Sequence, residues 1–201
     1  MAEVLILHGW QNHRPEGHWQ RWLAGELGAG GRAVRYPQLP EPDAPARAEW
    51  LAALETELEG TDPAELTVVA HSLGCMLWVA HARARAAAGL TGPVARRVLL
   101  VGPPSDAVVA SIAELTEFAA VDAGHEASTH IDAVAVVTAA LAAASVEPPV
   151  VVAGDHDPYS PVEAEGLAAR LGLERIVVDG GGHLTIEDGF GPFPLILELC
   201  A

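Results

Sequence analysis

The chain has 201 residues, of which half are hydrophobic and 19% are charged, a composition that fits one globular domain rather than a disordered chain. Acidic residues outnumber basic ones by 27 to 11, so the net charge is −16. This excess of carboxylates argues against binding to nucleic acid or to anionic membranes, because both attract clusters of positive charge.

Six short apolar runs predict six β-strands. The runs are nearly continuous in Val, Leu and Ile rather than alternating with polar residues, which is typical of strands buried on both faces of a parallel sheet. They span residues 4–8, 32–36, 66–71, 97–101, 150–153 and 175–178.

Helical spacing of apolar residues fills most of the gaps between these runs. Helices are expected at 18–27, 46–59, 73–87 and 160–172. Strands that alternate with helices indicate an α/β, doubly wound architecture, a mainly parallel six-stranded sheet with helices on both faces. We expect the strand order 2-1-3-4-5-6.

The segment 102–148 lacks a clear strand. It carries two helical patterns, near 107–120 and 131–144, which would either cover the sheet or form a small lid over a site. No internal repeat or linker appears, so the sequence predicts a single domain over 1–201 with a possible lid within 102–148.

The stretch "VVAHSLGC" at 68–75 resembles the G-x-S-x-G nucleophile elbow, with Ala70 in place of the first glycine. In this motif a sharp strand-to-helix turn exposes the serine, and small residues two positions before and after it let the backbones pass closely. Ala70 and Gly74 meet that demand. Ser72 is therefore the candidate nucleophile, the alternative being an ordinary turn.

A serine hydroxyl needs a base and an acid to become a good nucleophile. In α/β-hydrolases these follow in the chain order Ser, acid, His. The fifth apolar run ends in Asp155 and Asp157, and the sixth is followed by three glycines and His183. We expect the triad Ser72, Asp157 and His183, with Asp155 as the alternative acid.

Acyl transfer also needs donors for the developing oxyanion. The backbone N–H groups of Leu73, directly after the nucleophile, and of Trp10, in the loop after the first strand, are the candidates. Both would lie where the winding of the sheet reverses, which is where ligands bind in such folds. His8 is interpreted as structural. Four aromatic residues on the loops around the expected site are candidate substrate contacts: Trp10, Tyr159, Phe190 and Phe193.

No metal or organic cofactor is predicted. "HEASTH" at 125–130 differs from the zinc motif H-E-x-x-H by one extra residue, which places its two histidines on different faces of a helix. Neither Cys75 nor Cys200 has metal-ligand spacing. Two cysteines suit a reducing compartment, and the first ten residues, which include Glu3, lack the basic start of a signal peptide. We therefore expect a cytoplasmic protein.

These motifs resemble the small α/β-hydrolases related to retinoblastoma-binding protein nine, along nearly the whole chain. The resemblance rests on "VLILHGW", "HWQRWL", "YPQLPEP", "AHSLGC", "GDHDPYSP" and "GGHLTIEDGFGPFP". It implies a compact serine hydrolase that lacks the first two strands of the full fold, with the triad Ser72, Asp157 and His183. The sequence departs from the family at Ala70 and at Phe193, where tryptophan is usual. A Leu-x-Cys-x-Glu segment is absent, so the protein partner of the animal relative is not carried over.

The predicted function is hydrolysis of a carboxylic ester or related small acyl compound through an acyl-serine intermediate. The alternative is a catalytically weak hydrolase-fold protein that acts as a binding or scaffolding module, because fold and triad do not fix function.

Overall fold

Six parallel strands form the sheet at the centre of the protein, in the order β2-β1-β3-β4-β5-β6. The structure is a computed structural model that describes residues 2–119, 127–160 and 166–201. The strands are β1 (Glu3–Leu7), β2 (Ala33–Arg35), β3 (Leu66–His71), β4 (Arg97–Val101), β5 (Val150–Gly154) and β6 (Glu174–Val178). The strand order, the parallel direction and the expected fold class are thereby confirmed.

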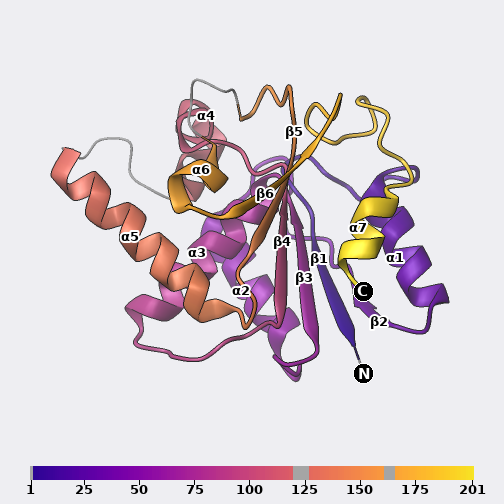
Figure 1. Cartoon of the computed structure of the whole chain (residues 1–201), viewed down its shortest axis with the longest axis horizontal. Coiled ribbons are helices and arrows are strands. Elements are labelled where there is room, and N and C mark those ends of the chain that lie inside the picture. Colours follow the sequence, from indigo (N-terminus) through magenta and orange to yellow (C-terminus); the bar gives the residue numbers. More distant parts are fainter. Residues whose placement is uncertain (1, 120–126, 161–165) are drawn as a thin grey trace.

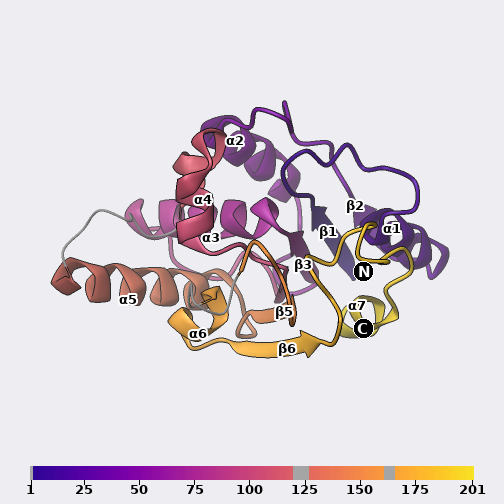
Figure 2. The ribbon, with the colours of Figure 1, turned by 90° about the horizontal axis from the view of Figure 1, so that it is seen from above.

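Helices cover both faces of this sheet (Figures 1 and 2). On one face lie α1 (Trp19–Ala29) and α7 (Pro194–Leu199), and on the other α2 (Arg47–Leu58), α3 (Leu73–Ala87), α5 (Ala127–Ala144) and α6 (Leu167–Leu171). The bounds of the first three predicted helices are met to within two residues. Of the helix expected at 160–172, Leu167–Leu171 is helical, and 161–165 lie outside the described residues.

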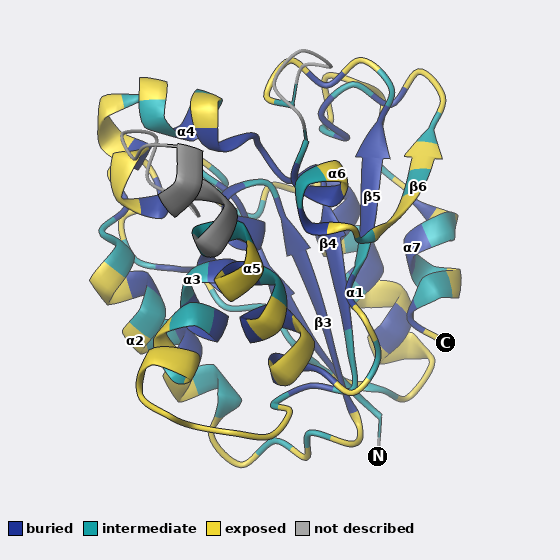
Figure 3. Ribbon diagram, turned by 60° about the vertical axis from the view of Figure 1, so that its left-hand side comes forward, coloured by how far each residue is buried: buried dark blue, intermediate teal, exposed yellow. Residues whose placement is uncertain are grey.

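Two apolar layers sandwich the sheet, and β3 is therefore buried on both of its faces. Its side chains alternate between the layers, as a strand requires: Val68 and Ala70 join the cluster under α2, α3 and α5, and Val69 joins the cluster under α1 and α7. Figure 3 shows the contrast between this buried centre and the more exposed β6 at one edge.

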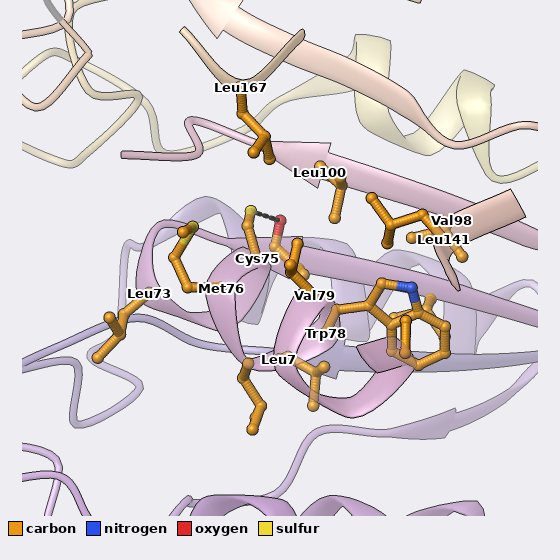
Figure 4. Packing of buried hydrophobic residues seen from close by; sticks show 14 of the residues in the cluster. Leu7, Leu73, Cys75, Met76, Trp78, Val79, Val98, Leu100, Leu141 and Leu167 are labelled. Atoms are coloured by element: carbon orange, nitrogen blue, oxygen red, sulfur yellow. Dashed lines mark hydrogen bonds between the residues drawn. The ribbon is translucent and has the colours of Figure 1, made fainter. Parts of the chain in front are cut away.

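Helix α3 is the most deeply buried helix near the site. Leu73, Cys75, Met76 and Trp78 are all at most 1% exposed, and Figure 4 shows Trp78 beside Val98 of β4 and Leu141 of α5. The Cys75 thiol donates a hydrogen bond to the Ala70 carbonyl at 3.3 Å, which joins the start of α3 to the end of β3. The first turn of α3 is therefore fixed against the strand that precedes it.

The segment 102–148 forms α4 (Asp106–Ser111), the 3₁₀ helix η1 (Ala113–Phe118) and α5 in its described part. Phe118 packs edge-on against Trp50 of α2, with ring centroids 5.4 Å apart, and Val137 and Leu141 of α5 belong to the core. In this part of the segment η1 packs against α2 and α3, and α5 packs against α3. Residues 120–126 lie outside the described residues, so the lid stays a prediction.

Because the strands are parallel, their carboxyl ends lie along one end of the sheet, where the arrowheads of β3, β5 and β6 point in Figure 3. The chain reverses its winding between β1 and β3, and the loops that follow these two strands therefore lie next to each other there. No helix among the described residues has the length and apolar character to cross a membrane.

Candidate active site

Ser72 occupies the turn between β3 and α3 in a strained backbone conformation. Its φ is 52° and its ψ is −123°, a region that residues other than glycine rarely adopt, at a cost of about 1–3 kcal/mol. The turn is held by the Ser72 N–H, which donates to the Val101 carbonyl at 3.0 Å. The Ser72 side chain does not cap α3, so its hydroxyl is free to face the adjoining loops.

A continuous hydrogen-bonded chain joins Ser72, His183 and Asp157. The Ser72 hydroxyl donates to Nε2 of His183 at 2.9 Å, and Nδ1 of His183 lies 3.0 Å and 2.9 Å from the two carboxylate oxygens of Asp157. Asp157 is 4% exposed and His183 is 8% exposed. The structure thus brings the three predicted triad residues together in the geometry that proton transfer from a serine requires.

The two candidate acids have different partners. Asp157 also accepts the Tyr159 N–H at 2.8 Å, which fixes its carboxylate in the turn after β5. Asp155 instead accepts the Gly181 N–H at 3.2 Å, and hydrogen bonds from Gly180 and Gly181, together with the nearby His156, hold the pKa of Asp155 below its ordinary value. Asp155 therefore ties down the glycine loop before His183, and Asp157 is the acid that contacts the imidazole.

The small residues around Ser72 are required by close backbone contacts. A Cβ built on Gly74 would lie 2.8 Å from the carbonyl oxygens of both Leu7 and His8. Ala70 is fully buried, and its methyl group packs in the core under α3. Gly74 therefore has no room for a side chain, whereas the position of Ala70 accommodates one methyl group.

The loop after β1 passes directly beside the nucleophile. A Cβ on Gly9 would lie 2.7 Å from the Ser72 Cβ and 3.2 Å from its Oγ. Trp10 follows on this loop, and Leu73 is the first residue of α3, where an N–H group has no acceptor within the helix. The assignment of the Trp10 and Leu73 N–H groups as oxyanion donors stays a prediction.

His8 is a buried and neutral part of the scaffold. Nδ1 lies 2.8 Å from the Gly9 carbonyl, and Nε2 accepts the Leu39 N–H at 2.8 Å. Burial lowers the pKa of His8 to about 4. Its two ring nitrogens fasten the loop after β1 to the loop that follows β2, in line with its interpretation as structural.

A cavity of about 710 Å³ opens above the triad. Ser72 and His183 line this cavity, together with the apolar side chains of Trp10, Tyr159 and Ile186. The Tyr159 ring lies against the His183 ring, with centroids 4.4 Å apart. The other polar residues of the lining are Gln11, Asn12, His13, His18, His71, Thr185, Glu187 and Asp188.

Of the four aromatic residues expected to contact substrate, the structure places two elsewhere. Trp10 and Tyr159 line the cavity, but Phe190 and Phe193 are absent from its described lining. Phe193 is 5% exposed and packs edge-on against Trp19, at 5.7 Å, and against Phe190, at 4.9 Å. Phe193 immediately precedes Pro194, the first residue of α7, and this turn directs its ring into the core instead of the cavity.

The sequence did not single out the residues that hold the His183 loop. The ring of His71 donates from Nε2 to the His183 carbonyl at 3.0 Å, and Asp188 accepts the His183 N–H at 2.9 Å. Only a general signal was available, namely a histidine at the end of a mostly apolar strand and an acid in the glycine-rich block.

The histidines of the loop after β1 have structural partners. His13 pairs with Asp43 at 3.1 Å on the surface, and His18 caps α1 by accepting the Gln20 N–H at 3.2 Å. Within residues 2–119, 127–160 and 166–201, no three His, Cys, Asp or Glu side chains are grouped to hold a metal ion. Part of the "HEASTH" stretch lies outside those ranges.

Solved structures with the same fold include several hydrolases. The ydeN gene product from B. subtilis superposes with a TM-score of 0.73 at 23% identity, covering 99% of this chain and 96% of that one. An esterase domain from a Rhodothermus marinus protein superposes with a TM-score of 0.62 at 16% identity, covering 98% of this chain and 84% of that one. A thioesterase domain from the curacin biosynthetic pathway superposes with a TM-score of 0.61 at 16% identity, covering 99% of this chain and 90% of that one. At these identities the likeness shows the fold alone.

No curated protein matches the sequence significantly. The family model described as serine hydrolase, however, matches residues 4–201, almost the full length of the sequence and all the elements that carry Ser72, Asp157 and His183. The chain therefore belongs to the serine hydrolase family.

Proposed function

We propose that this protein hydrolyses uncharged carboxylic esters of small molecules through an acyl-Ser72 intermediate. The observation that carries the proposal is the series of hydrogen bonds from Ser72 through His183 to Asp157, with Ser72 among the residues that line the cavity. Within the family, we also propose kinship with the small hydrolases related to retinoblastoma-binding protein nine, supported by the motifs around Ser72 and His183.

In each half-reaction of the proposed mechanism, His183 acts first as a general base and then as a general acid. His183 takes the Ser72 proton as the hydroxyl attacks the ester carbonyl, while Asp157 holds the ring and stabilises the imidazolium. The N–H groups of Trp10 and Leu73 would then stabilise the oxyanion. His183 returns the proton to the departing alcohol, and water enters to release the acid by the same steps.

The charge of the cavity supports an uncharged substrate. The chain contains no lysine, and none of its eleven arginines is among the described residues of the wall. Glu187 and Asp188, which are exposed and line the cavity, add negative charge. An anionic acyl group or a phosphate-bearing thioester would find no counter-charge there, so we favour neutral esters over thioesters of anionic carriers.

Labelling with a fluorophosphonate probe tests the nucleophile. The folded protein should be labelled at Ser72, as located by peptide mapping, and Ser72→Ala should remove the label. Heat-denatured protein is the control for nonspecific reaction. Folded protein without label on Ser72 would refute the proposal.

Turnover of p-nitrophenyl esters tests the function itself. Wild type should cleave p-nitrophenyl butyrate faster than Ser72→Ala by a factor on the order of 10³ or more, and faster than the hemisuccinate ester of the same length. Equal rates for wild type and Ser72→Ala would favour the scaffolding alternative. A preference for the hemisuccinate would contradict the charge argument. A panel over acyl chain length then defines the substrate.

The cellular setting is part of the proposal. Cys75 and Cys200 are both free and buried, which supports a protein of a reducing compartment such as the cytoplasm.

A further inference from the structure

The loop that carries His183 adopts a conformation that needs support from outside. Leu184 has a φ of 58°, in the left-handed region that side chains disfavour, and Gly182 has a φ of 51°. Such conformations persist only where the surroundings over-determine them. The direction of the His183 ring depends on these neighbours, because the ring is attached to the backbone between them.

Asp188 supports the amino side of His183. Its Oδ2 accepts three hydrogen bonds, from the His183 N–H at 2.9 Å, the Thr185 N–H at 3.1 Å and the Thr185 hydroxyl at 3.0 Å. The carboxylate lies so close to Gly182 that a Cβ there would come within 2.3 Å of Asp188 Oδ1. Asp188 therefore fixes the turn around His183 although the residue itself is exposed.

His71 supports the carboxyl side. It is 3% exposed, and burial among other histidines holds its pKa well below the ordinary value, so the ring is neutral. Because a carbonyl only accepts, Nε2 of His71 carries the proton and donates it to the His183 carbonyl at 3.0 Å. Nδ1 has no hydrogen-bond partner in the described part of the chain, so the ring makes this one polar contact.

Aromatic packing holds the His71 ring in place. Trp19 meets it edge-on at 5.4 Å and also donates from its indole N–H to the Leu184 carbonyl at 2.9 Å. The carbonyls of His183 and Leu184 are thus both engaged by buried side chains, from the end of β3 and from α1.

We propose that His71 and Asp188 are positioning residues that clamp the backbone on the two sides of His183, so that its Nε2 faces Ser72. The proposal rests on the proposed hydrolase function for its kinetic effect, although the clamp itself can be observed without turnover. A misplacement of about 1 Å in such a site can cost on the order of 100-fold in rate.

Two substitutions of His71 separate the hydrogen bond from the packing of the ring. His71→Phe keeps a ring and removes the donor, whereas His71→Gln removes the ring and keeps an N–H near the position of Nε2. With p-nitrophenyl butyrate, kcat of His71→Phe should fall about 10- to 100-fold below that of His71→Gln. KM should be unchanged in both. Equal activities, or a more active His71→Phe, would overturn the role of the bond.

Asp188→Ala tests the other side of the clamp, with Asp179→Ala as the matched control on an exposed acid of the same connection. Asp188→Ala should lose about 10-fold or more in kcat, and Asp179→Ala should match wild type. Equal activity of the two variants would overturn the proposal for Asp188. If circular dichroism shows that His71→Phe is unfolded, this pair still tests the proposal, because substitution of an exposed residue such as Asp188 leaves the core intact.

A spectroscopic measurement makes the clamp testable without any ester. The proton between His183 Nδ1 and Asp157 should give a far-downfield ¹H resonance in wild type and in Ser72→Ala. It should broaden or vanish in His71→Phe and Asp188→Ala, and persist in His71→Gln and Asp179→Ala. An unchanged resonance in both of the first two variants would overturn the clamp. If no ester is cleaved, the proposed function fails while this result still decides the present inference.

Discussion

Gly9 lies against Ser72 so closely that a methyl group on Gly9 would come within 2.7 Å of the serine Cβ. The loop after β1 and the turn after β3 are therefore in direct backbone-to-side-chain contact, although Gly9 and Ser72 are 63 positions apart in the sequence. This contact places Trp10, one of the two expected oxyanion donors, beside the nucleophile.

Gly9→Ala should reduce kcat/KM by about 100- to 1,000-fold, because the loop must move away from Ser72 and take an oxyanion donor with it. Gly25→Ala, at a helical glycine with nothing within 4 Å of its would-be Cβ, is the matched control and should be as active as wild type. Ester turnover measures both. An active Gly9→Ala variant would contradict the role of this loop.

Asp157→Asn should lower kcat on the order of 10⁴-fold while the fold is retained, because an amide favours the wrong tautomer of His183. Asp155→Asn should lose far less, since Asp155 bonds the glycine loop rather than the imidazole. The comparison uses the same ester for both variants. If Asp155→Asn were the more damaging, the assignment of the acid would be wrong.

Neither cysteine should react readily with Ellman's reagent in the native protein. Burial raises the pKa of the Cys200 thiol to about 11 and raises that of Cys75 further, so the reactive thiolate is scarce at neutral pH. Two thiols should appear once the protein is unfolded in guanidinium. A thiol that titrates rapidly under native conditions would contradict the burial of these side chains.

Stability should decrease as the pH falls from 7 to 5. Burial lowers the pKa of His8 and of His18 to about 4, against an ordinary value of 6.5. Between pH 6.5 and pH 4 the unfolded chain therefore binds more protons than the folded protein does. Each histidine therefore lowers the free energy of unfolding by up to about 1.4 kcal/mol per pH unit in that window, and the loss ends below pH 4. Urea unfolding at pH 7, 6 and 5 measures the slope, and a flat profile would refute it.

Phe193 and Tyr159 should respond differently to substitution. Phe193→Leu should lower the free energy of unfolding by about 0.5–3 kcal/mol with KM unchanged, because the ring packs in the core. Tyr159 is 37% exposed and lines the cavity. Tyr159→Ala should therefore raise KM with little effect on stability. Thermal melts and Michaelis curves on both variants check this. A change of KM confined to Phe193→Leu would reverse the two assignments.

The sequence predicted the elements that local pattern controls. The continuous apolar runs located all six strands to within two residues, and the bounds of α3 agree fully, because an apolar strand, a small–His–Ser–x–Gly turn and an Ala-rich helix each leave a local signal. The order Ser72, Asp157, His183 could be anticipated because each residue follows a strand, and parallel strands end at the same end of the sheet.

Side-chain direction within the loops could not be anticipated. Phe193 lies on a loop near the site, but its ring is turned into the core by the start of α7. The role of His71 depends on His183, a partner 112 residues away, and no local pattern encodes such a contact. Sequence therefore located the loops of the site, whereas tertiary packing decides which side chains reach the cavity.

The base His183 and the nucleophile Ser72 follow strands that differ in burial and in backbone pairing. Ser72 follows β3, in which every residue is buried between two neighbouring strands, whereas His183 follows β6, a half-exposed strand with one neighbour. Fraying begins where burial and backbone pairing are weakest. On heating, turnover should therefore disappear before the far-ultraviolet circular dichroism changes, and recover when the edge strand re-pairs, so activity reports the integrity of the rim of the sheet rather than of its centre.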